Sequence, residues 1–272
     1  MFKGGGDIVE QNIFMGTRDM EQLMELVMAS NAKRELLDNQ AEVVRIIPEM
    51  KPCIGFQQNS PYHIYDVWGH IVTAVDEAAD DYLVRMALLL HDIGKPRCYK
   101  ADENGIGHFH GHGHVSAEIT DAVLTRLGAD PAFKERVVTL VRYHDMRIDV
   151  CSRAVSRLVG KIGEGQFNKL LLVREADVLA QAPGYERQRL DKIANLRCIK
   201  ERVKTEKQAA EQSKLELSGT DLLSIGYEQG PAIGRQLCVL REMVQKDSLL
   251  NQHDVLLEQS VKALRQEKHS RA

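Results

Sequence analysis

The chain has 272 residues, with 36 Lys and Arg against 39 Asp and Glu and a net charge of −3. This length can bury a core without disulfides, and the charge gives no bulk attraction to nucleic acid. The five cysteines are scattered and never spaced as Cys-x-x-Cys, which argues against a thiolate zinc site and favours a reducing, cytoplasmic setting. No apolar run approaches the roughly 18 residues that span a bilayer, so we expect no membrane partner.

Apolar residues recur at three-to-four spacing through most of the chain, which predicts an all-α fold. Residues 1–58 are expected to form an N-terminal helical cap, with one helical pattern from Met20 to Leu37 and another from Ala41 to Ile47. The apolar face of the first pattern comprises Leu23, Leu26, Val27 and Leu37.

A longer helical bundle, expected over residues 59–184, follows the loop from Cys53 to Pro61 and ends at Pro183-Gly184. Residues 185–272 are expected to form a linker helix and a C-terminal helical module. The linker, from Glu186 to Leu215, is rich in charge and predicts a long, exposed helix. The module begins at Leu217.

Eight of the ten histidines fall between residues 63 and 144. His70 lies three residues after Val67 on an apolar helix face, so it should point inward. His91 follows Ala87 by four residues in the pattern from Asp81 to Gly94, where glycine supplies a natural helix end. It should also point inward, with Asp92 beside it.

Three further polar residues fall on apolar faces. His144 shares a face with Val137 and Leu140 in a helix that begins after Asp130-Pro131. Asp177 falls seven residues after Leu170 on one stripe. His112 precedes an apolar stripe and can reach inward from the first turn of that helix.

A single buried histidine is usually a hydrogen-bonded core residue. Several imidazoles and two carboxylates in one bundle are different, because burying unpaired carboxylates costs several kcal/mol. A bound divalent metal satisfies them together. Imidazole and carboxylate ligands suit Mn, Fe, Co, Ni or Zn, and such an ion activates water and polarises a phosphoryl oxygen. The cluster therefore predicts phosphohydrolase chemistry.

His70, His91-Asp92 and Asp177 resemble the H…HD…D signature of the HD superfamily of metal-dependent phosphohydrolases, whose cores are helical bundles. The dipeptide stands here within His91-Asp92-Ile93-Gly94-Lys95-Pro96, with Gly111-His112 and Ser116-Ala117-Glu118 about twenty residues later. More closely, Asn59 to His70, Gly105 to Glu118 and Leu140 to His144 look like the HD domain of bacterial CCA-adding tRNA nucleotidyltransferases.

The C-terminal segment resembles the same enzymes through Ser218 to Leu223, Gly230 to Gly234 and Asn251 to Leu257. The resemblance implies a module that could engage tRNA. Those enzymes also carry a nucleotidyltransferase head with paired catalytic aspartates. Gly4-Gly5-Gly6-Asp7 has no preceding strand and no following Asp-x-Asp, so we expect a flexible terminus and no head.

The resemblance implies a first metal held by His70, His91, Asp92 and Asp177, with Asp92 bridging to a second at His112 and His144. One or two ions are expected, of Mn, Ni, Co, Fe, Zn or Mg. The catalytic residues would be Asp92, which bridges the ions or orients the nucleophile, and Lys95, which would bind the substrate phosphate. Charge compensation at a helix C-terminus is the alternative for Lys95.

Other polar residues near the cluster have simpler interpretations. His108, His110 and His114 are expected in a Gly-rich loop, with ligation or substrate contact as the alternative. Ion pairing or surface exposure is expected for Arg142, Arg147 and Arg174, a phosphate clamp being the alternative. Core packing is expected for Trp68 and Tyr62, with base stacking as the alternative.

These features predict an enzyme that hydrolyses a phosphate ester of a nucleotide, a cyclic phosphate or an RNA end. A second hypothesis is a tRNA-binding or RNA-binding protein in which the metal is structural and nothing is turned over. A third is an inactive relative whose helical tail forms a homodimer, because the linker helix has an apolar seam from Ile193 to Val203.

Overall fold

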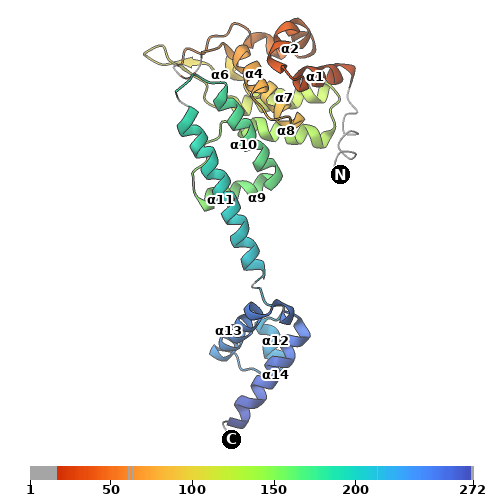
Figure 1. The fold of residues 1–272 in the computed structure, drawn as a ribbon, viewed down its shortest axis with the longest axis vertical. Coiled ribbons are helices and arrows are strands. Elements are labelled where there is room, and N and C mark those ends of the chain that lie inside the picture. Colours follow the sequence, from red (N-terminus) through yellow and green to blue (C-terminus); the bar gives the residue numbers. More distant parts are fainter. Residues whose placement is uncertain (1–16, 61, 63, 185, 213, 271–272) are drawn as a thin grey trace, which may run out of the picture. The chain divides into compact units, whose positions relative to one another are not determined.

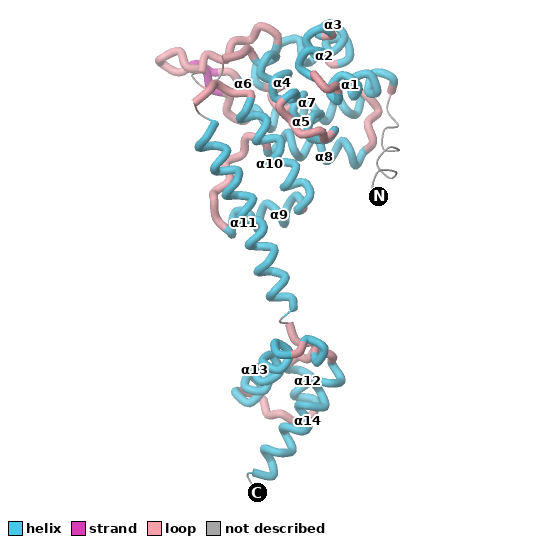
Figure 2. The backbone as a smooth tube through the Cα atoms, in the orientation of Figure 1, coloured by secondary structure: helices cyan, strands magenta, loops and turns pink. Residues whose placement is uncertain are grey.

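The structure is a computed structural model that describes residues 17–60, 62, 64–184, 186–212 and 214–270. The Gly4–Asp7 segment, expected as a flexible terminus, lies outside these residues, as does His63. The chain divides into two compact units at Lys200, each with its own core. Each unit is almost wholly helical (Figures 1 and 2), so the predicted all-α class is confirmed.

The N-terminal elements are α1 (Arg18–Met28), α2 (Ala32–Asp38), α3 (Gln40–Ile46) and the 3-10 helix η1 (Pro48–Cys53). The single helical pattern predicted from Met20 to Leu37 is wrong, because the Asn31 side chain accepts from the Arg34 backbone nitrogen (3.1 Å) and starts a new helix. Because α2 is a separate helix from α1, the residue that faces the core near its end is one position before the expected one. Leu36 is therefore buried, whereas Leu37 is 43% exposed.

The bundle packs around α5 (Tyr82–Leu90), whose side chains are nearly all apolar and all buried after Tyr82. A helix that is apolar on every side belongs in a core. It packs against α1, α4 (Val67–Asp76), α8 (Pro131–Tyr143) and α10 (Glu164–Leu179). Around them lie α6 (Lys95–Cys98), α7 (His112–Arg126) and α9 (Ser152–Ile162) (Figure 1).

The segment between α6 and α7 carries a short antiparallel hairpin that the sequence did not predict. Strand β1 (Lys100–Ala101) pairs with β2 (Gly107–His108) in the register Lys100 with His108. Asp102 caps the turn, since its side chain accepts from the Asn104 and Ile106 nitrogens (both 2.9 Å). The strands are too short to give a period-two pattern.

Helix α11 (Glu186–Gln212) is less exposed at its start than the sequence suggested. Ile193 (4% exposed) and Leu196 (1%) belong to the core of the first unit, which extends to Lys200. The apolar seam expected to mediate a homodimer is therefore occupied within the chain over these two residues.

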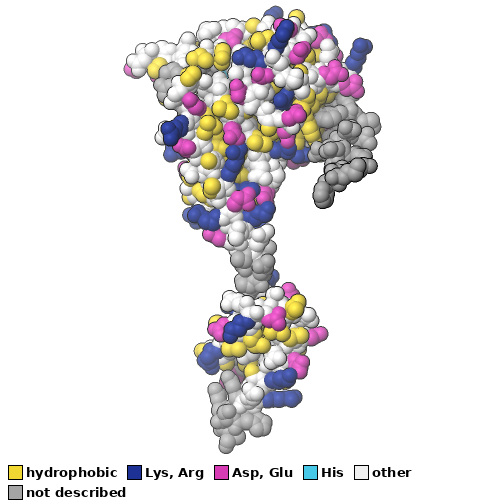
Figure 3. All heavy atoms as spheres, viewed as in Figure 1, with side chains coloured by type: hydrophobic (Ala, Val, Ile, Leu, Met, Phe, Trp, Pro, Cys, Tyr) yellow, Lys and Arg dark blue, Asp and Glu magenta, His cyan; other side chains and the backbone are white. Residues whose placement is uncertain are grey.

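The second unit contains α12 (Gly219–Ser224), α13 (Pro231–Lys246), η2 (Ser248–Leu250) and α14 (His253–Ser270). Ser218 and Asp221 form a reciprocal capping box at the start of α12. The small core comprises Leu217, Leu222, Tyr227, Leu240, Val244 and Leu256. On the face drawn in Figure 3, basic and acidic side chains are interspersed over each unit. None of the helices in the described part of the chain has both the length and the apolarity needed to cross a bilayer.

Candidate metal centre

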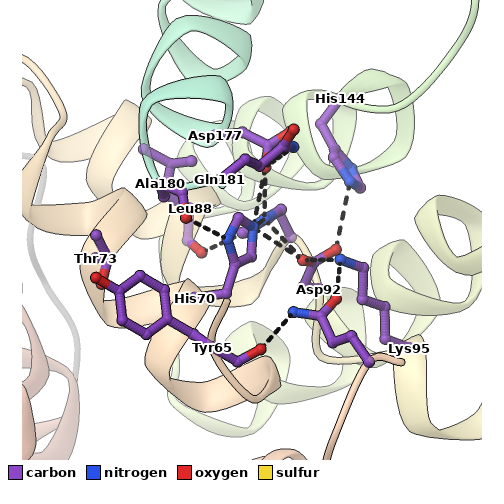
Figure 4. Close-up of polar contacts among 12 residues, drawn as sticks. Tyr65, His70, Thr73, Leu88, Asp92, Lys95, His144, Asp177, Ala180 and Gln181 are labelled. Atoms are coloured by element: carbon purple, nitrogen blue, oxygen red, sulfur yellow. Dashed lines mark hydrogen bonds and ion pairs between the residues drawn. The ribbon is translucent and has the colours of Figure 1, made fainter. Parts of the chain in front are cut away.

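Six side chains from five segments of the bundle converge on one buried centre. Figure 4 labels four of them, His70, Asp92, His144 and Asp177. They come from α4, the end of α5 and the turn after it, the start of α7, the end of α8, and the last turns of α10. All six residues that the sequence analysis assigned as ligands are brought together: His70, His91, Asp92, His112, His144 and Asp177.

Helix ends position two of the histidines. Asp130 caps α8 by accepting from the Ala132 and Phe133 nitrogens (3.0 and 2.9 Å), and the helix delivers His144 at its C-cap. His112 is the first residue of α7, after Gly111 in the left-handed region (φ 79°). A side chain at Gly111 would strain this turn, so glycine there sets the direction in which His112 enters.

Every histidine of the cluster is oriented by its own Nδ1 atom. His70 donates to Ala180 O (3.3 Å), His91 to Leu88 O (2.6 Å), His112 to Phe109 O (2.8 Å) and His144 to Val141 O (2.7 Å). A carbonyl can only accept, so each Nδ1 carries a proton. In the neutral ring, Nε2 is then an unprotonated nitrogen available as a metal ligand.

The Nε2 atoms face one another in two pairs. His70 and His91 are separated by 3.3 Å at Nε2, and His112 and His144 by 3.0 Å. Two nitrogen lone pairs at such distances repel unless a proton or a cation lies near both. The geometry therefore fits a cation at each pair.

Asp92 lies between the two pairs and is 1% exposed. Its Oδ2 is 3.3 Å from His70 Nε2 and 3.1 Å from His91 Nε2. Its Oδ1 faces the second pair, 3.2 Å from His112 Nε2 and 3.7 Å from His144 Nε2. Neither oxygen accepts a well-directed hydrogen bond from the described residues. A buried carboxylate in this state fits a metal ligand.

Asp177 completes the first pair only. Its Oδ1 is 3.0 Å from His70 Nε2 and 3.7 Å from His91 Nε2, and it accepts from Gln181 Nε2 at 3.3 Å. The arrangement thus offers two nitrogens and the Asp177 carboxylate on one side of Asp92, and two nitrogens on the other. Both groups are dense enough to hold an ion, with Asp92 shared.

Burial and mutual charge shift the protonation of the cluster. Burial disfavours the imidazolium of His91, but the carboxylates of Asp92 and Asp177 outweigh it and raise its pKa to about 10. Burial would raise the pKa of Asp177, yet His70 and His91 hold it well below the usual range. Burial would likewise raise the pKa of Asp92, but His91 and Lys95 hold it well below the usual range. For His144, burial lowers the pKa.

Residues 62–182 match the HD domain family. This part of the chain is an HD domain. The match lies inside the bundle that the sequence placed at residues 59–184, and it contains all six residues of the centre.

The chain is also similar to curated enzymes. It is 33% identical to the A-adding tRNA nucleotidyltransferase of Deinococcus radiodurans and 30% identical to the CC-adding tRNA nucleotidyltransferase of Thermus thermophilus. Each match covers 83% of this chain, and 53% and 52% of the relative. A bifunctional uridylyltransferase/uridylyl-removing enzyme of Mycobacterium tuberculosis is 31% identical over 55% of this chain and 19% of its own. The chain spans about half the length of the tRNA nucleotidyltransferases.

Lys95 of the HD domain lies beside Asp92 and is 5% exposed. It is the first residue of the four-residue helix α6 and follows the C-cap of α5 at His91 by four residues. Its Nζ is 2.7 Å from Asp92 Oδ2 and donates to Gln58 Oε1 at 2.8 Å. Gln58 is itself buried and donates to Tyr65 O (3.3 Å). Gln58 could not be identified from the sequence, because a lone polar residue in an irregular loop gives no periodic signal.

A cavity of about 380 Å³ opens onto the HD domain centre. Tyr62, expected in the core, is 41% exposed and lines the cavity, with Arg189 over its ring (5.1 Å). The core prediction is therefore wrong for Tyr62, whereas Trp68 is buried as expected (3% exposed).

The remaining polar candidates lie outside the buried cluster. His108 pairs with Asp102 (3.1 Å), and His108 and His110 border the cavity. His114 is exposed and contacts Arg142 (3.0 Å between Nδ1 and Nη1). Arg147 pairs with Asp149 (3.7 Å), which is the ion pair expected for it. Arg174 has no such pair among the described residues and is considered below.

Proposed function

We propose that the chain is a metal-dependent phosphohydrolase that acts on a nucleotide, a cyclic phosphate or an RNA end. The observation that carries the proposal is the pairing of imidazole Nε2 atoms around a buried, shared carboxylate. The HD domain match supports it, since this class of domain suggests metal-dependent phosphohydrolysis.

Two ions fit the centre. His70, His91 and Asp177 would hold the first with Asp92 Oδ2, and His112 and His144 would hold the second with Asp92 Oδ1. The second ion has fewer protein ligands, so more of its coordination is left for water and substrate. We therefore expect it to bind more weakly than the first.

The donor set limits the metal. Nitrogen and carboxylate ligands without thiolate suit Mn, Fe, Co, Ni and Zn, and Mg where water completes the shell. Cys53 is buried, and burial raises the pKa of its thiol to about 12. Its sulfur points to Ile93 O (3.8 Å) and takes no part in either ligand group.

A bound divalent ion supplies a nucleophilic water near neutral pH and polarises the phosphoryl oxygens. The chain's own residues then have separate tasks. Asp92 fixes the spacing of the two ligand groups. Lys95, which borders the cavity, would donate to a non-bridging phosphoryl oxygen, and Gln58 would hold its Nζ beside Asp92.

The lining of the cavity and the names of the relatives support the proposed substrate class. Tyr62 and Phe109 give the cavity aromatic walls suited to a base, and Lys95 gives it a cation at the deep end. The names of two relatives specify tRNA, and that of a third includes removal of a uridylyl group. A nucleotide or the end of an RNA fits both considerations.

A second candidate function is RNA binding without turnover. The similarity to the tRNA nucleotidyltransferases covers 236 residues and so extends well beyond residues 62–182. The second unit would then bind RNA through its helix ends and scattered basic residues. Loss of RNA binding on deletion of residues 217–272, with no turnover in any metal form, would support this function.

The deciding experiment compares the wild type with Asp92→Asn and Asp76→Asn. Asp76 is an exposed carboxylate on α4, the helix that carries His70, so it controls for charge loss outside the centre. Metal content is measured after purification without chelator, and turnover is assayed with 2′,3′-cyclic nucleotides, nucleoside monophosphates and a 3′-phosphorylated oligonucleotide. We expect Asp92→Asn alone to lose metal and turnover. Turnover that persists in Asp92→Asn would refute the proposal.

A further inference from the structure

A second cavity, of about 240 Å³, adjoins the metal centre between α10 and α11. It shares His144, Asp177 and Arg189 with the first cavity, so the two form one continuous depression on the first unit. The first cavity reaches Lys95 and the hairpin, and the second runs the other way along α11.

Three cationic side chains line this second cavity: Arg174 on α10, and Arg189 and Lys192 on α11. Arg189 and Lys192 are three residues apart and share a helix face. All three are half-buried. Asp145 and Asp177 line the same cavity, so its three cations are only partly compensated by carboxylates.

Arg174 lacks the partner that its burial requires. Its Nη1 atom is buried without a hydrogen-bond partner, and none of the described carboxylates lies within ion-pair distance of its guanidinium. Asp177, the acid one turn along α10, is occupied by His70 and His91. Burial lowers the pKa of Arg174. Asp145 and Asp177 act on its charge from a distance and raise the pKa in opposition to burial, but neither forms an ion pair with it. A half-buried guanidinium with an unsatisfied donor fits a site for an incoming anion.

Other cations at the same helix interface are neutralised. Arg197 on α11 pairs with Glu175 on α10, next in sequence to Arg174. Lys200 pairs with Glu164 (3.3 Å) and donates to Asn168 (3.1 Å). Arg189 donates to the neutral side chain of Gln181 and lies over the Tyr62 ring. Among the described residues, the cations of this interface that lack a carboxylate partner are therefore at the end that borders the metal centre.

We propose that Arg174, Arg189 and Lys192 form a subsite for a second phosphate of the substrate, adjacent to the phosphate that is hydrolysed. The inference rests on the proposed function, because the metal centre and Lys95 would hold the reacting phosphate. Arg174 offers two parallel donors to phosphate oxygens, and Lys192 offers a point charge. The second phosphate is either the 5′-phosphate of a nucleoside bisphosphate or the internucleotide phosphate of an oligonucleotide.

With this subsite, a substrate that carries two phosphates should bind more tightly than a substrate that carries one. A charge-assisted pair contributes about 1.5–3 kcal/mol, so discrimination of roughly tenfold to a hundredfold is expected. A mononucleotide without a second phosphate offers these three cations no anion and gains none of this binding.

The test measures equilibrium binding of adenosine 3′-monophosphate and adenosine 3′,5′-bisphosphate to chelator-treated protein, which excludes metal-dependent turnover. Ligand-detected NMR suits the weak affinities expected without metal. The wild type should bind the bisphosphate at least about tenfold more tightly. Arg174→Gln and Lys192→Gln should each reduce that ratio toward one, and Arg174→Lys should restore part of it. The matched control Arg197→Gln, whose guanidinium pairs with Glu175, should keep the wild-type ratio.

A dinucleotide with a 3′-phosphate distinguishes the two sources of the second phosphate. Tighter binding than the bisphosphate would assign the subsite to an RNA end, and weaker binding would assign it to a nucleoside bisphosphate. Equal affinity of the monophosphate and the bisphosphate in the wild type would overturn the subsite, as would an unchanged ratio in both Gln variants.

Turnover of the metal-loaded protein separates the two proposals. Discrimination in binding without turnover would keep the subsite and refute the hydrolase. Turnover with equal kcat/KM for substrates with one and two phosphates would keep the hydrolase and refute the subsite. Circular dichroism establishes that each variant is folded before either comparison is made.

Discussion

His70 Nε2 lies 3.3 Å from His91 Nε2, although both rings already donate from Nδ1 to a backbone carbonyl. In the metal-free protein a proton on His91 relieves this contact, because Asp92 and Asp177 raise its pKa to about 10. A proton on His91 Nε2 and a metal ion therefore compete for the same position between the two imidazoles. This competition links metal affinity, stability and pH.

Metal binding should release protons at neutral pH. His91 keeps its Nε2 proton well above pH 7, and the pKa of His112 is also raised by Asp92 against the effect of burial. An incoming ion must displace these protons, so affinity should rise about tenfold per pH unit for each proton released. Calorimetric titration with Mn²⁺ in two buffers of different ionisation enthalpy measures the number released. The same apparent enthalpy in both buffers would contradict the prediction.

The metal-free protein should lose stability as the pH rises from 7 toward 10. His91 has its ordinary pKa of 6.5 when unfolded and about 10 when folded. The folded state therefore holds a proton that the unfolded state has lost, and the free energy of unfolding falls by about 1.4 kcal/mol per pH unit over this interval. Thermal unfolding with chelator present tests this against His91→Gln, in which the slope should be shallower. Identical slopes would show that His91 does not hold this proton.

The positions of most ligands could be predicted from the sequence because they continue an apolar helix face. His70 follows Val67, His144 follows Leu140, and Asp177 follows Leu170, and all three faces are buried. Periodicity reports which side of a helix faces inward, and a polar residue on that side must be near other buried groups. The meeting point of these faces is a tertiary feature, and only the resemblance to a known signature supplied it.

Periodicity did not predict features that depend on the surface against which an apolar helix face packs, or on a local helix cap. The apolar stripe of α11 was correctly located, but its packing on the first unit through Ile193 and Leu196 was not predictable from the stripe. The cap at Asn31 broke one expected helix into two, and so exchanged Leu37 for Leu36 in the core. The exposure of Tyr62 and the burial of Gln58 depend on loop geometry, which carries no repeating pattern.

Gly94→Ala should destabilise the protein and weaken the second ligand group. A Cβ at residue 94 would lie 2.7 Å from Ser116 N and 3.1 Å from His112 O, so α7 and its His112 would have to move. Overpacking of this kind costs about 1–3 kcal/mol. The control is Gly160→Ala on α9, where a Cβ meets nothing within 4 Å. It should stabilise by up to about 1 kcal/mol through helix propensity.

Chemical unfolding and metal stoichiometry measure the two glycine variants together. Gly94→Ala should have a lower denaturation midpoint and retain less than the wild-type metal content, whereas Gly160→Ala should retain all of it. Wild-type stability and metal content in Gly94→Ala would show that the contact between Gly94 and α7 is not needed to place His112.

Lys95→Met should lower turnover and leave metal binding intact. The Lys95 ammonium lies 2.7 Å from Asp92 Oδ2, where its charge opposes an incoming cation, so its removal should not weaken metal affinity. Loss of one preorganised donor to a phosphoryl oxygen typically costs about 10²–10³ in kcat. Lys51→Met, at an exposed lysine of η1, controls for loss of positive charge and should retain wild-type turnover.

Metal content and steady-state kinetics on the same preparations separate two roles for Lys95. Full metal content with a kcat reduced about a hundredfold would place Lys95 on the substrate phosphate. Loss of metal in parallel with activity would instead mean that Lys95 mainly orients Asp92, because the carboxylate would then leave the two histidine pairs when its cationic neighbour is absent. Retention of both metal and wild-type kcat would remove Lys95 from the mechanism, leaving Asp92 as the only residue assigned to it.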